Sequence, residues 1–318
     1  MTIKRTYAKR LYRKSISLPR LFKMFPNDEA AQKWFFKQRW KGGLKAMRCP
    51  YCEGRNVSES KTHPTMPYRC YDCRRFYSLK TGTVMQGSKL GYQKWVIAMY
   101  VMTTNLKGVS STKLARDLDI TQKSAWHMVH RIRESWADKS DVFGGPAEVD
   151  ETFVGGKDRN RHEWKVQEGR GPKGKTAVVG IKDRVSGKVE AEVVATTDKH
   201  TLQGFVAVNT EVDATVYTDE ASAYRGLPRQ HEAVKHSVKE FVRGQAHTNG
   251  IESFWAMLKR GYVGVYHHFS TKHLQRYVNE FAGRHNDRPL DTIDQLANMA
   301  SGMVGKRLRY ADLIASKS

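Results

Sequence analysis

Hydrophobic residues recur at the spacing of an α-helix in the N-terminal part of the chain. The segment EAAQKWFFKQRW, which follows PND at 26–28, predicts a short capped helix, and GYQKWVIAMYVMTTN at 91–105 predicts a more apolar one. The longest uninterrupted apolar run, WVIAMYVM at 95–102, is far too short to span a bilayer, so no membrane partner is expected. The C-terminal third carries further helical patterns.

Two helical patterns follow each other in STKLARDLDITQKSAWHMVHRIRESW at 111–136. A turn around Asp119 and Ile120 separates them, Thr121 is placed to cap the second, and Trp126 is expected in their shared core. This pattern predicts a helix-turn-helix whose second helix can enter a DNA groove, although any helical hairpin has a similar sequence. The polar side chains that the second helix would turn outward are Gln122, Lys123, Ser124, His127 and Arg131.

Beyond the linker SDVFGGP at 140–146, the apolar spacing changes from that of helices to that of strands. Ser186 and Gly187 provide the turn of a hairpin between the second and third predicted strands. A helical pattern at 197–209 lies between the third and fourth strands and predicts a parallel crossover. These elements predict a mixed α/β domain. The four predicted strands are 147–156, 175–183, 188–196 and 214–218.

All four cysteines lie in two CxxC pairs, Cys49 with Cys52 and Cys70 with Cys73. The C-x2-C-x17-C-x2-C spacing is typical of a zinc site in which each pair supplies two thiolates from a tight turn. A redox motif needs a single CxxC, and disulfides are not expected in the reducing interior of a cell. The sequence therefore predicts one structural Zn²⁺ per chain, held in a zinc ribbon over about 47–80.

The chain is strongly basic, with 55 Lys and Arg against 32 Asp and Glu and a net charge of +23. This balance indicates a polyanionic partner such as DNA, although a ribosomal or merely basic protein shares it. Residues 1–27 contain no acidic residue and are expected to form a mobile basic arm without a secretory signal. The insertion at 155–175 is expected to be either a solvated loop or a flap that orders on DNA. A cytoplasmic, nucleoid-associated protein is therefore expected.

Acidic residues in and after the predicted strands are candidate metal ligands. Asp219 directly follows the strand ATVYT, where ligand sites of parallel sheets lie, but it can also cap a helix starting at EASAY. Asp150 lies within an apolar strand, where an unpaired carboxylate is costly. Glu148 shares the strand face of Asp150 and Glu151 points the other way. Physical reasoning alone leaves open which of the three is the ligand.

Glu252 lies near the start of an amphipathic helix in HTNGIESFWAMLKR at 247–260. Asn249 can be the N-cap with Glu252 as its capping-box partner, or the carboxylate can be held at the helix start to bind a metal. Mg²⁺ prefers carboxylate oxygens, and two such ions held by three carboxylates can drive an in-line displacement at a DNA phosphate. Lys259, seven residues on and on the same helix face, can contact DNA phosphate or simply be solvated.

The order of these segments resembles that of a known family. The ribbon and the helical region are followed by EVDETFVGGK, VYTDEASAY and HTNGIESFWAMLKRGYVGVYHH. This order is similar to that of bacterial insertion-sequence DDE transposases of the ISXO type, the subgroup with an N-terminal zinc ribbon. The resemblance extends from about residue 15 to 310.

The resemblance implies a ribonuclease-H-like fold in which Asp150, Asp219 and Glu252 hold two Mg²⁺ or Mn²⁺ ions. It also implies a basic partner at Lys259, with His247 and Asn249 in supporting roles. The expected fold class is thus multidomain, with a zinc ribbon and a helix-turn-helix before an α/β catalytic domain that has a mixed sheet. The expected divisions are 1–46 (arm and short helix), 47–80 (ribbon), 83–138 (helix-turn-helix region), 147–300 (catalytic domain) and 301–318 (tail).

The expected function is transposition. The protein would bind terminal inverted repeats of double-stranded DNA, cleave at the element ends and join the 3′-hydroxyl ends to target DNA, as a homodimer or a larger assembly. Two rival functions remain. One is a non-enzymatic DNA-binding regulator built on the ribbon and the helix-turn-helix, and the other is a domesticated metal-dependent nuclease without strand transfer.

Overall fold

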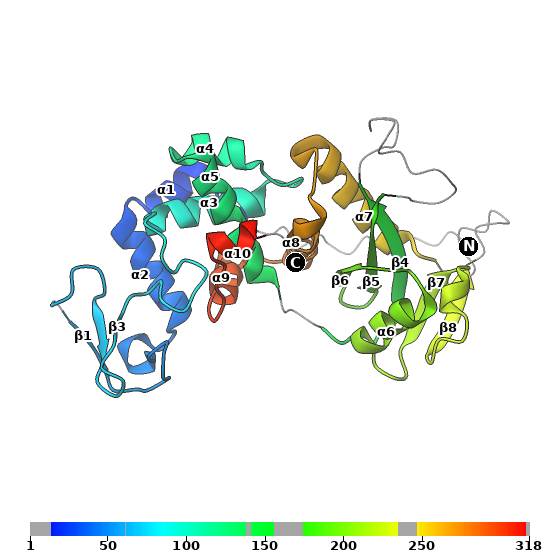
Figure 1. Cartoon of the computed structure of the whole chain (residues 1–318), viewed down its shortest axis with the longest axis horizontal. Coiled ribbons are helices and arrows are strands. Elements are labelled where there is room, and N and C mark those ends of the chain that lie inside the picture. The colour runs from blue at the N-terminus through cyan, green and yellow to red at the C-terminus, as the bar shows by residue number, and fades with distance from the viewer. Residues whose placement is uncertain (1–13, 61, 138–140, 156–173, 235–246, 316–318) are drawn as a thin grey trace, which may run out of the picture. The chain divides into compact units, whose positions relative to one another are not determined.

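The computed structural model describes residues 14–60, 62–137, 141–155, 174–234 and 247–315 (Figure 1). The chain divides into two compact units, one within residues 1–104 and 287–308 and the other within 105–286 and 309–318. Residues 1–13 of the predicted basic arm and 156–173 of the insertion at 155–175 lie outside the described residues. The rest of the arm differs from the expected mobile segment, because Leu18–Met24 form the helix α1 and Leu21 is buried. The domain boundaries expected from the sequence stay predictions.

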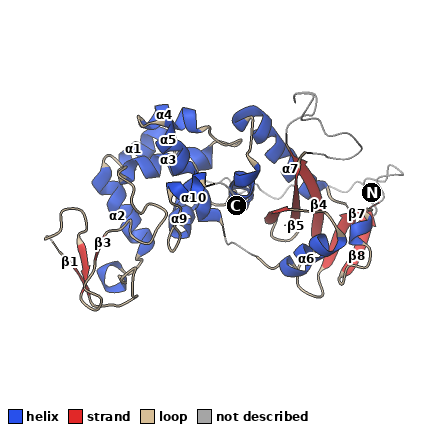
Figure 2. Cartoon of the chain, in the orientation of Figure 1, coloured by secondary structure: helices blue, strands red, loops and turns tan. Residues whose placement is uncertain are grey.

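The first unit combines helices with the small sheet of the ribbon (Figure 2). The sequence predicted a short capped helix here, and α2 (Asp28–Arg39) begins after Asn27, whose side-chain oxygen accepts from the amide of Ala30 at 2.9 Å. α3 (Tyr92–Thr104) is largely buried and packs against α2 and α9 (Thr292–Gly302). A helix from late in the sequence is therefore part of this unit. Its other elements include α1 (Leu18–Met24), β1 (Val57–Glu59), β2 (Tyr68–Cys70) and β3 (Phe76–Tyr77).

The second unit begins with two short helices, α4 (Ser111–Leu118) and α5 (Gln122–Arg133). Asp119 adopts a φ of 48° in the turn between them, and Thr121 caps α5 by accepting from the amide of Ser124 at 3.2 Å. The helices and this cap agree with the sequence prediction. Trp126, expected in the shared core, is only half-buried, and it packs edge-on against the rings of His130 and His273.

A buried cluster of charges anchors α5 to α8 (Leu274–Asn286). Arg133 donates from Nε to Glu280 at 2.8 Å, and both side chains are at most 1% exposed. Arg284 donates to the same carboxylate at 3.1 Å, and the hydroxyl of Tyr266 donates to it at 3.0 Å. Because buried charges persist only when they are paired and hydrogen-bonded, this cluster fixes α5 against α8.

A mixed five-stranded sheet forms the centre of the second unit, in the order β6-β5-β4-β7-β8. β4 pairs antiparallel with β5 and β5 with β6, whereas β4–β7 and β7–β8 are parallel. α6 (Lys199–Asn209) connects β6 to β7, which run in the same direction, so the predicted hairpin and crossover are both present. The strands are β4 (Ala147–Val154), β5 (Thr176–Asp183), β6 (Val189–Val194), β7 (Thr215–Asp219) and β8 (Gln230–Val234).

The sequence prediction missed β8. Its segment QHEAV has a single buried residue, Val234, at its end. An edge strand that is mostly exposed needs few apolar side chains, so its sequence lacks the alternation that identified the other four strands.

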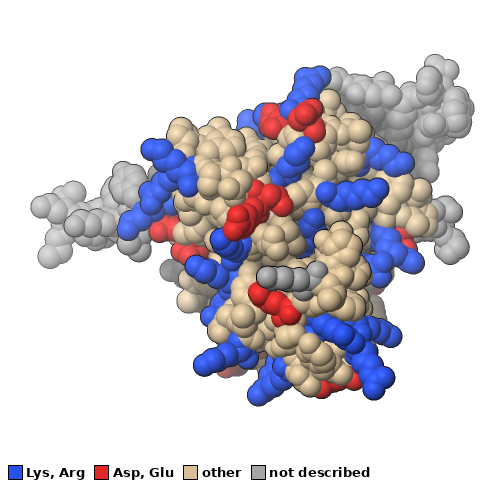
Figure 3. Space-filling view, turned by 90° about the vertical axis from the view of Figure 1, so that its left-hand side faces the viewer, with Lys and Arg blue, Asp and Glu red and all other residues tan. Residues whose placement is uncertain are grey.

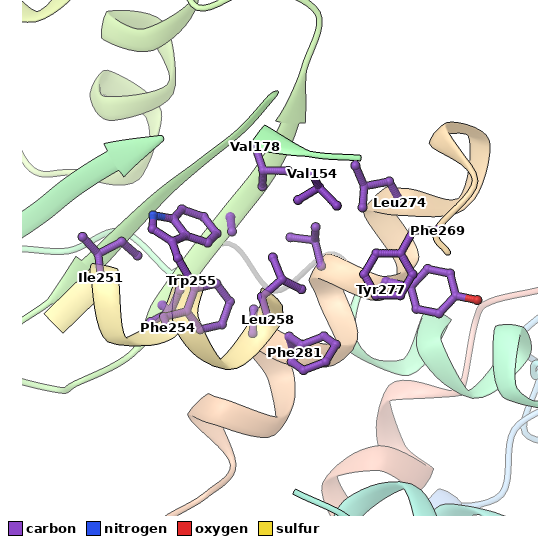
Figure 4. Packing of buried hydrophobic residues seen from close by; sticks show 14 residues of the cluster. Val154, Val178, Ile251, Phe254, Trp255, Leu258, Phe269, Leu274, Tyr277 and Phe281 are labelled. Carbon is purple, nitrogen blue, oxygen red and sulfur yellow. The ribbon is translucent and has the colours of Figure 1, made fainter. Parts of the chain in front are cut away.

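Two hydrophobic clusters lie on opposite faces of this sheet. α7 (Asn249–Gly261) and α8 cover one face, where Trp255 and Phe281 pack with strand residues such as Val154 (Figure 4). α6 covers the other face, where Val149 of β4 belongs to its cluster. Successive side chains of a strand point to opposite faces, so this alternation decides which face each acidic residue of β4 reaches. Among the described residues, no helix combines the length and the apolar character that crossing a membrane requires.

Candidate functional site

The four cysteines come together at one point of the ribbon. Cys49 Sγ lies 3.5 Å from Cys73 Sγ, and Cys52 Sγ lies 3.7 Å from Cys70 Sγ, without disulfides. Four sulfurs at about 2.3 Å from one tetrahedral Zn²⁺ would lie about 3.8 Å apart. The spacing therefore fits a single zinc ion with no open coordination position.

The two cysteine pairs lie in turns of the same kind. In each, the amide of the first cysteine donates at 3.0 Å to the carbonyl five residues further on. The residue directly after the second cysteine has a positive φ, 57° at Glu53 and 60° at Arg74. Each turn thus folds back on itself and presents two thiolates together, which is the arrangement that the CxxC spacing predicted.

Parallel pairing of β4 with β7 places two acidic residues side by side. Glu148 pairs with Tyr217, and two residues further along the strands are Asp150 and Asp219, the last residue of β7. Residues two apart on a strand share a face. Both aspartates therefore lie on the sheet face that α7 covers.

α7 carries Glu252 over the same sheet face. Gly180 of β5 pairs with Asp150, and a Cβ at Gly180 would lie 2.6 Å from ring atoms of Trp255 in α7. The missing side chain thus lets α7 approach the sheet closely beside Asp150. Glu252 lies in the first turn of α7, is exposed, and accepts at 2.8 Å from the hydroxyl of Thr248.

The electrostatics of this face favour a cation. Burial, followed by the charges of Glu151 and Asp219, raises the pKa of Asp150 to about 7, and Glu252 contributes in the same direction. Carboxylates that repel one another at a half-buried position are costly unless a positive charge offsets them. Their oxygen atoms are the ligands that Mg²⁺ and Mn²⁺ prefer.

The carboxylates are spread more widely than the cysteines. In the described part of the chain, only the four cysteines form a group of three or more possible ligands whose ligand atoms all lie within 4.8 Å of one another. A pair of ions about 3.5–4 Å apart, completed by water and a substrate phosphate, spans more space than one ion. The wider set of Asp150, Asp219 and Glu252 fits such a pair.

The other two acids of β4 have partners within the protein. Glu148 accepts from Nε of Arg184 at 2.8 Å and from the amide of Ile251 at 3.0 Å. Glu151 lies on the opposite sheet face, where it accepts from the hydroxyl of Tyr224 at 2.8 Å. These contacts give both carboxylates a role in the fold. Asp150 differs from both, because the charges that act most strongly on it are the negative ones of Glu151 and Asp219.

The capping-box alternative for Glu252 is contradicted. The N-cap of α7 is Thr248 and not Asn249, so Glu252 lies four residues after the cap instead of three. Its carboxylate accepts from the hydroxyl of Thr248, whereas a capping box joins the carboxylate to the backbone amide of the cap residue. The contact orients Glu252 without consuming all of its acceptor sites.

Asp219 does not cap an α-helix either. The segment EASAY forms only a short 3₁₀ helix at Ser222–Tyr224, with Ala221 at its N-cap position. Asp219 instead accepts from the amide of Ala221 at 3.1 Å, which closes the turn after β7. Lys259, near the end of α7, is exposed.

The predicted DNA-contacting side chains of α5 have neighbours in the same unit. Gln122 donates to the hydroxyl of Ser111 at 2.9 Å, and the ammonium of Lys123 lies 4.5 Å from the ring centre of Tyr310 in α10 (Tyr310–Ile314). Gln122 and Lys123 are exposed, whereas Arg131 is half-buried. Their contacts with DNA stay predictions.

Two family matches cover well over half of the chain. Residues 142–286, which contain all three candidate carboxylates, match the ISXO2-like transposase domain. Residues 26–75, which contain all four cysteines, match the transposase zinc-ribbon domain. The chain belongs to the zinc-ribbon insertion-sequence transposases. The resemblance read from the sequence motifs of this transposase is thereby confirmed.

Relatives of this transposase include a protein from a mobile element. An uncharacterized protein in the transposable element ISH50 of Halobacterium salinarum is 27% identical over 273 residues, which are 81% of this chain and 91% of the relative. A chain of a pre-cleavage Mos1 transpososome matches with 10% identity and a TM-score of 0.28, over 67% of this chain and 80% of that one.

A simian T-cell lymphotropic virus intasome, in complex with the PP2A regulatory subunit B56 gamma, contains a chain with 11% identity and a TM-score of 0.27. The match covers 53% of this transposase, which spans 63% of the length of that chain. TM-scores this low do not assign a fold.

Sequence reasoning missed the residues that support the site. Arg184 had no local signal, because the carboxylate it contacts lies 36 positions away in the sequence. Thr248 was missed because Asn249 beside it is the more favoured cap by residue type. The roles of both residues become visible only in the fold, which brings Arg184 to the carboxylate of Glu148 and begins α7 after Thr248.

The zinc centre gives a first prediction. We expect one zinc per chain by elemental analysis, and we expect Cys70→Ser to lose it and to unfold the ribbon, because so small a module has little core without its metal. Ser58→Ala, in β1 of the same module, is the matched control and should keep full zinc content. A Cys49→Ser/Cys52→Ser double variant that retains one zinc per chain would rule out this site.

Proposed function

We propose that this transposase cleaves double-stranded DNA at the ends of its element and joins the resulting 3′-hydroxyl ends to target DNA. The observation that carries the proposal is the arrangement of Asp150, Asp219 and Glu252 on one face of the sheet. Two adjacent parallel strands supply the aspartates, and the first turn of α7 supplies the glutamate. The family match and the net charge of +23 support DNA as the substrate.

We infer that the second unit has the ribonuclease-H-like fold that the resemblance implied. Three antiparallel strands followed by two parallel ones, with a helix crossing between β6 and β7, support this assignment. The candidate carboxylates lie on the central strand β4, on the neighbouring strand β7 and on the helix α7 that covers this face. A catalytic site built on such elements is held more rigidly than one built on loops.

We assign to the three carboxylates the binding of two Mg²⁺ or Mn²⁺ ions. When bound, these ions stabilise the attacking and leaving oxygens of an in-line displacement at a DNA phosphate. Asp150 and Asp219 would hold the ions from the sheet side, while Glu252, oriented by Thr248, would close the site from α7. The four cysteines would hold one Zn²⁺ that stabilises the ribbon and takes no part in the reaction.

We assign recognition of the terminal inverted repeats to the ribbon and to α4 and α5, which we interpret as the helix-turn-helix. Lys and Arg side chains are spread over the face that Figure 3 shows, with fewer acidic ones between them. Phosphate contacts of such side chains supply most of the affinity for DNA, and a few base contacts set the register. Because two element ends must be joined, a homodimer or a larger assembly on the DNA of the cell is expected.

The test of this function uses DNA duplexes that carry the repeats flanking the gene. Incubation with the full-length protein and Mg²⁺ should give nicks with 3′-hydroxyl ends at the repeat border and, with a target plasmid, joined products. Binding without any metal-dependent cleavage would establish the rival regulator. Cleavage without joined products would establish the rival nuclease.

Lys259 gives a second prediction. Lys259→Ala should weaken binding of end DNA and lower by about one the slope of log affinity against log salt, because one phosphate contact is lost. The rate at saturating DNA should change little, since the carboxylates are untouched. Lys199→Ala, an exposed lysine at the start of α6 on the opposite sheet face, is the matched control. An unchanged salt slope would show that Lys259 is merely solvated.

A further inference from the structure

One buried carboxylate fastens the start of α7 to the sheet. Glu148 is 2% exposed, and its Oε2 accepts from the amide of Ile251 at 3.0 Å. The two residues are 103 positions apart in the sequence. Glu148 precedes Asp150 by two residues on the same strand face, and Ile251 directly precedes Glu252. This hydrogen bond therefore links the two backbone segments that carry two of the proposed ligands.

Basic side chains hold Glu148 in this position. Arg184 donates from Nε to Glu148 Oε1 at 2.8 Å and from Nη2 to the carbonyl of His247 at 2.5 Å. His247 Nδ1 lies 3.2 Å from the same carboxylate oxygen, and Lys182 donates to the carbonyl of Gly250 at 3.4 Å. Both oxygens of Glu148 are thus engaged within the protein, and its buried charge is paired.

The first turn of α7 is shaped to receive this carboxylate. A Cβ at Gly250 would lie 2.6 Å from Glu148 Oε2 and 3.1 Å from Cδ of Lys182. Glycine is less favourable than alanine within a helix by about 1 kcal/mol. Glycine at position 250 therefore lowers the intrinsic stability of α7. The close approach of Glu148, which glycine permits, offsets this loss through the hydrogen bond to the amide of Ile251.

We propose that Glu148 is a positioning residue that holds the first turn of α7 so that Glu252 faces Asp150 and Asp219, without binding the metal itself. This inference rests on the proposed function, in which those three carboxylates bind Mg²⁺ or Mn²⁺. Groups that orient metal ligands change metal affinity by about ten- to a hundredfold when they are altered. Loss of a ligand, in contrast, removes the reaction at any metal concentration.

The test compares Glu148→Gln with the wild-type full-length protein. Glutamine keeps the shape of the side chain, but its amide nitrogen must face either Arg184 or the amide of Ile251, both of which are donors. We expect the half-saturating Mn²⁺ concentration to rise about tenfold or more, both in cleavage of end DNA and in a calorimetric titration without DNA. Cleavage should recover at saturating Mn²⁺. Glu192→Gln, exposed on β6, is the matched control and should leave both values unchanged.

A second variant keeps the proposal testable if Glu148→Gln fails to fold. Gly250→Ala pushes the turn away from Glu148 without removing a charge and improves helix propensity. It should raise the half-saturating Mn²⁺ concentration, and a cooperative thermal melt shows that the variant is folded.

Other outcomes overturn the proposal. Unchanged half-saturation in the folded variants would leave Glu148 with a structural role only. Loss of both cleavage and Mn²⁺ binding at every metal concentration, in a folded Glu148→Gln protein, would make Glu148 a ligand. If the wild-type protein does not cleave, the proposed function fails, but the titration without DNA still decides the role of Glu148.

Discussion

Replacing Glu252 by glutamine is expected to lower the rate of Mg²⁺-dependent end cleavage by about three orders of magnitude, with an unchanged thermal melt. The change removes an anionic oxygen from ions that need hard, charged ligands. Stabilisation of transition-state charge by such ions is worth several kcal/mol, and about 1.4 kcal/mol corresponds to a tenfold change in rate. Because Glu252 is exposed and its hydrogen bond with Thr248 lies within the start of its own helix, the fold should survive.

Asp150→Asn and Asp219→Asn should behave like Glu252→Gln, keeping end-DNA binding and losing cleavage. The three carboxylates act as a unit, so a double variant should be scarcely slower than a single one. Glu232→Gln, exposed on β8, is the control for the loss of one acidic charge. The measurement is single-turnover cleavage of labelled end DNA beside a melting curve. Cleavage at nearly the wild-type rate by Glu252→Gln would remove Glu252 from the ligand set.

Replacing Glu280 by alanine is expected to lower the free energy of unfolding of the second unit by about 3–5 kcal/mol. The carboxylate is fully buried and is the partner of Arg133 at 2.8 Å and of Arg284 at 3.1 Å. Its removal leaves two guanidinium groups without their counter-charge, and Arg133 has no access to water. Urea unfolding followed by tryptophan fluorescence measures the change.

Glu134→Ala provides the matched control for Glu280→Ala. Glu134 forms an ion pair with Arg276 of the same helix α8 at 2.6 Å, but its side chain is 23% exposed. Ion pairs in contact with solvent contribute about 1 kcal/mol or less, so this variant should lose much less stability. Equal losses from the two variants would contradict the anchoring role of the buried cluster.

The same cluster predicts how stability depends on pH. Burial acts to raise the pKa of Glu280, but the charges of Arg133 and Arg284 together outweigh it and hold the pKa below the ordinary value of 4.5. A carboxylate whose pKa is lowered by folding stabilises the protein above its unfolded pKa. This stabilisation should be complete at neutral pH and should disappear as the pH falls below 4.5. Glu280→Gln should show a weaker dependence in this range.

The sequence by itself determined the features that depend on neighbours along the chain. The spacing of the cysteines predicted a cluster of four thiolates, because two residues between paired cysteines fit one tight turn. The spacing of apolar residues predicted α3, α5 and four of the five strands of the mixed sheet, because the burial of one face repeats with the period of the element. Thr121 was predicted as a cap, since it contacts an amide only three residues away.

The tertiary structure alone decided which polar residues meet. Glu148 and Asp150 lie two residues apart on the same strand face, and the sequence did not distinguish their roles. The fold pairs Glu148 with a guanidinium group and with a backbone amide at the start of α7. The charges that raise the pKa of Asp150 are, in contrast, those of other carboxylates. The partners of Glu148 come from positions 36 and 103 residues away. Burial and pairing at such separations depend on how the strands and α7 pack, and no local pattern of side chains encodes that packing.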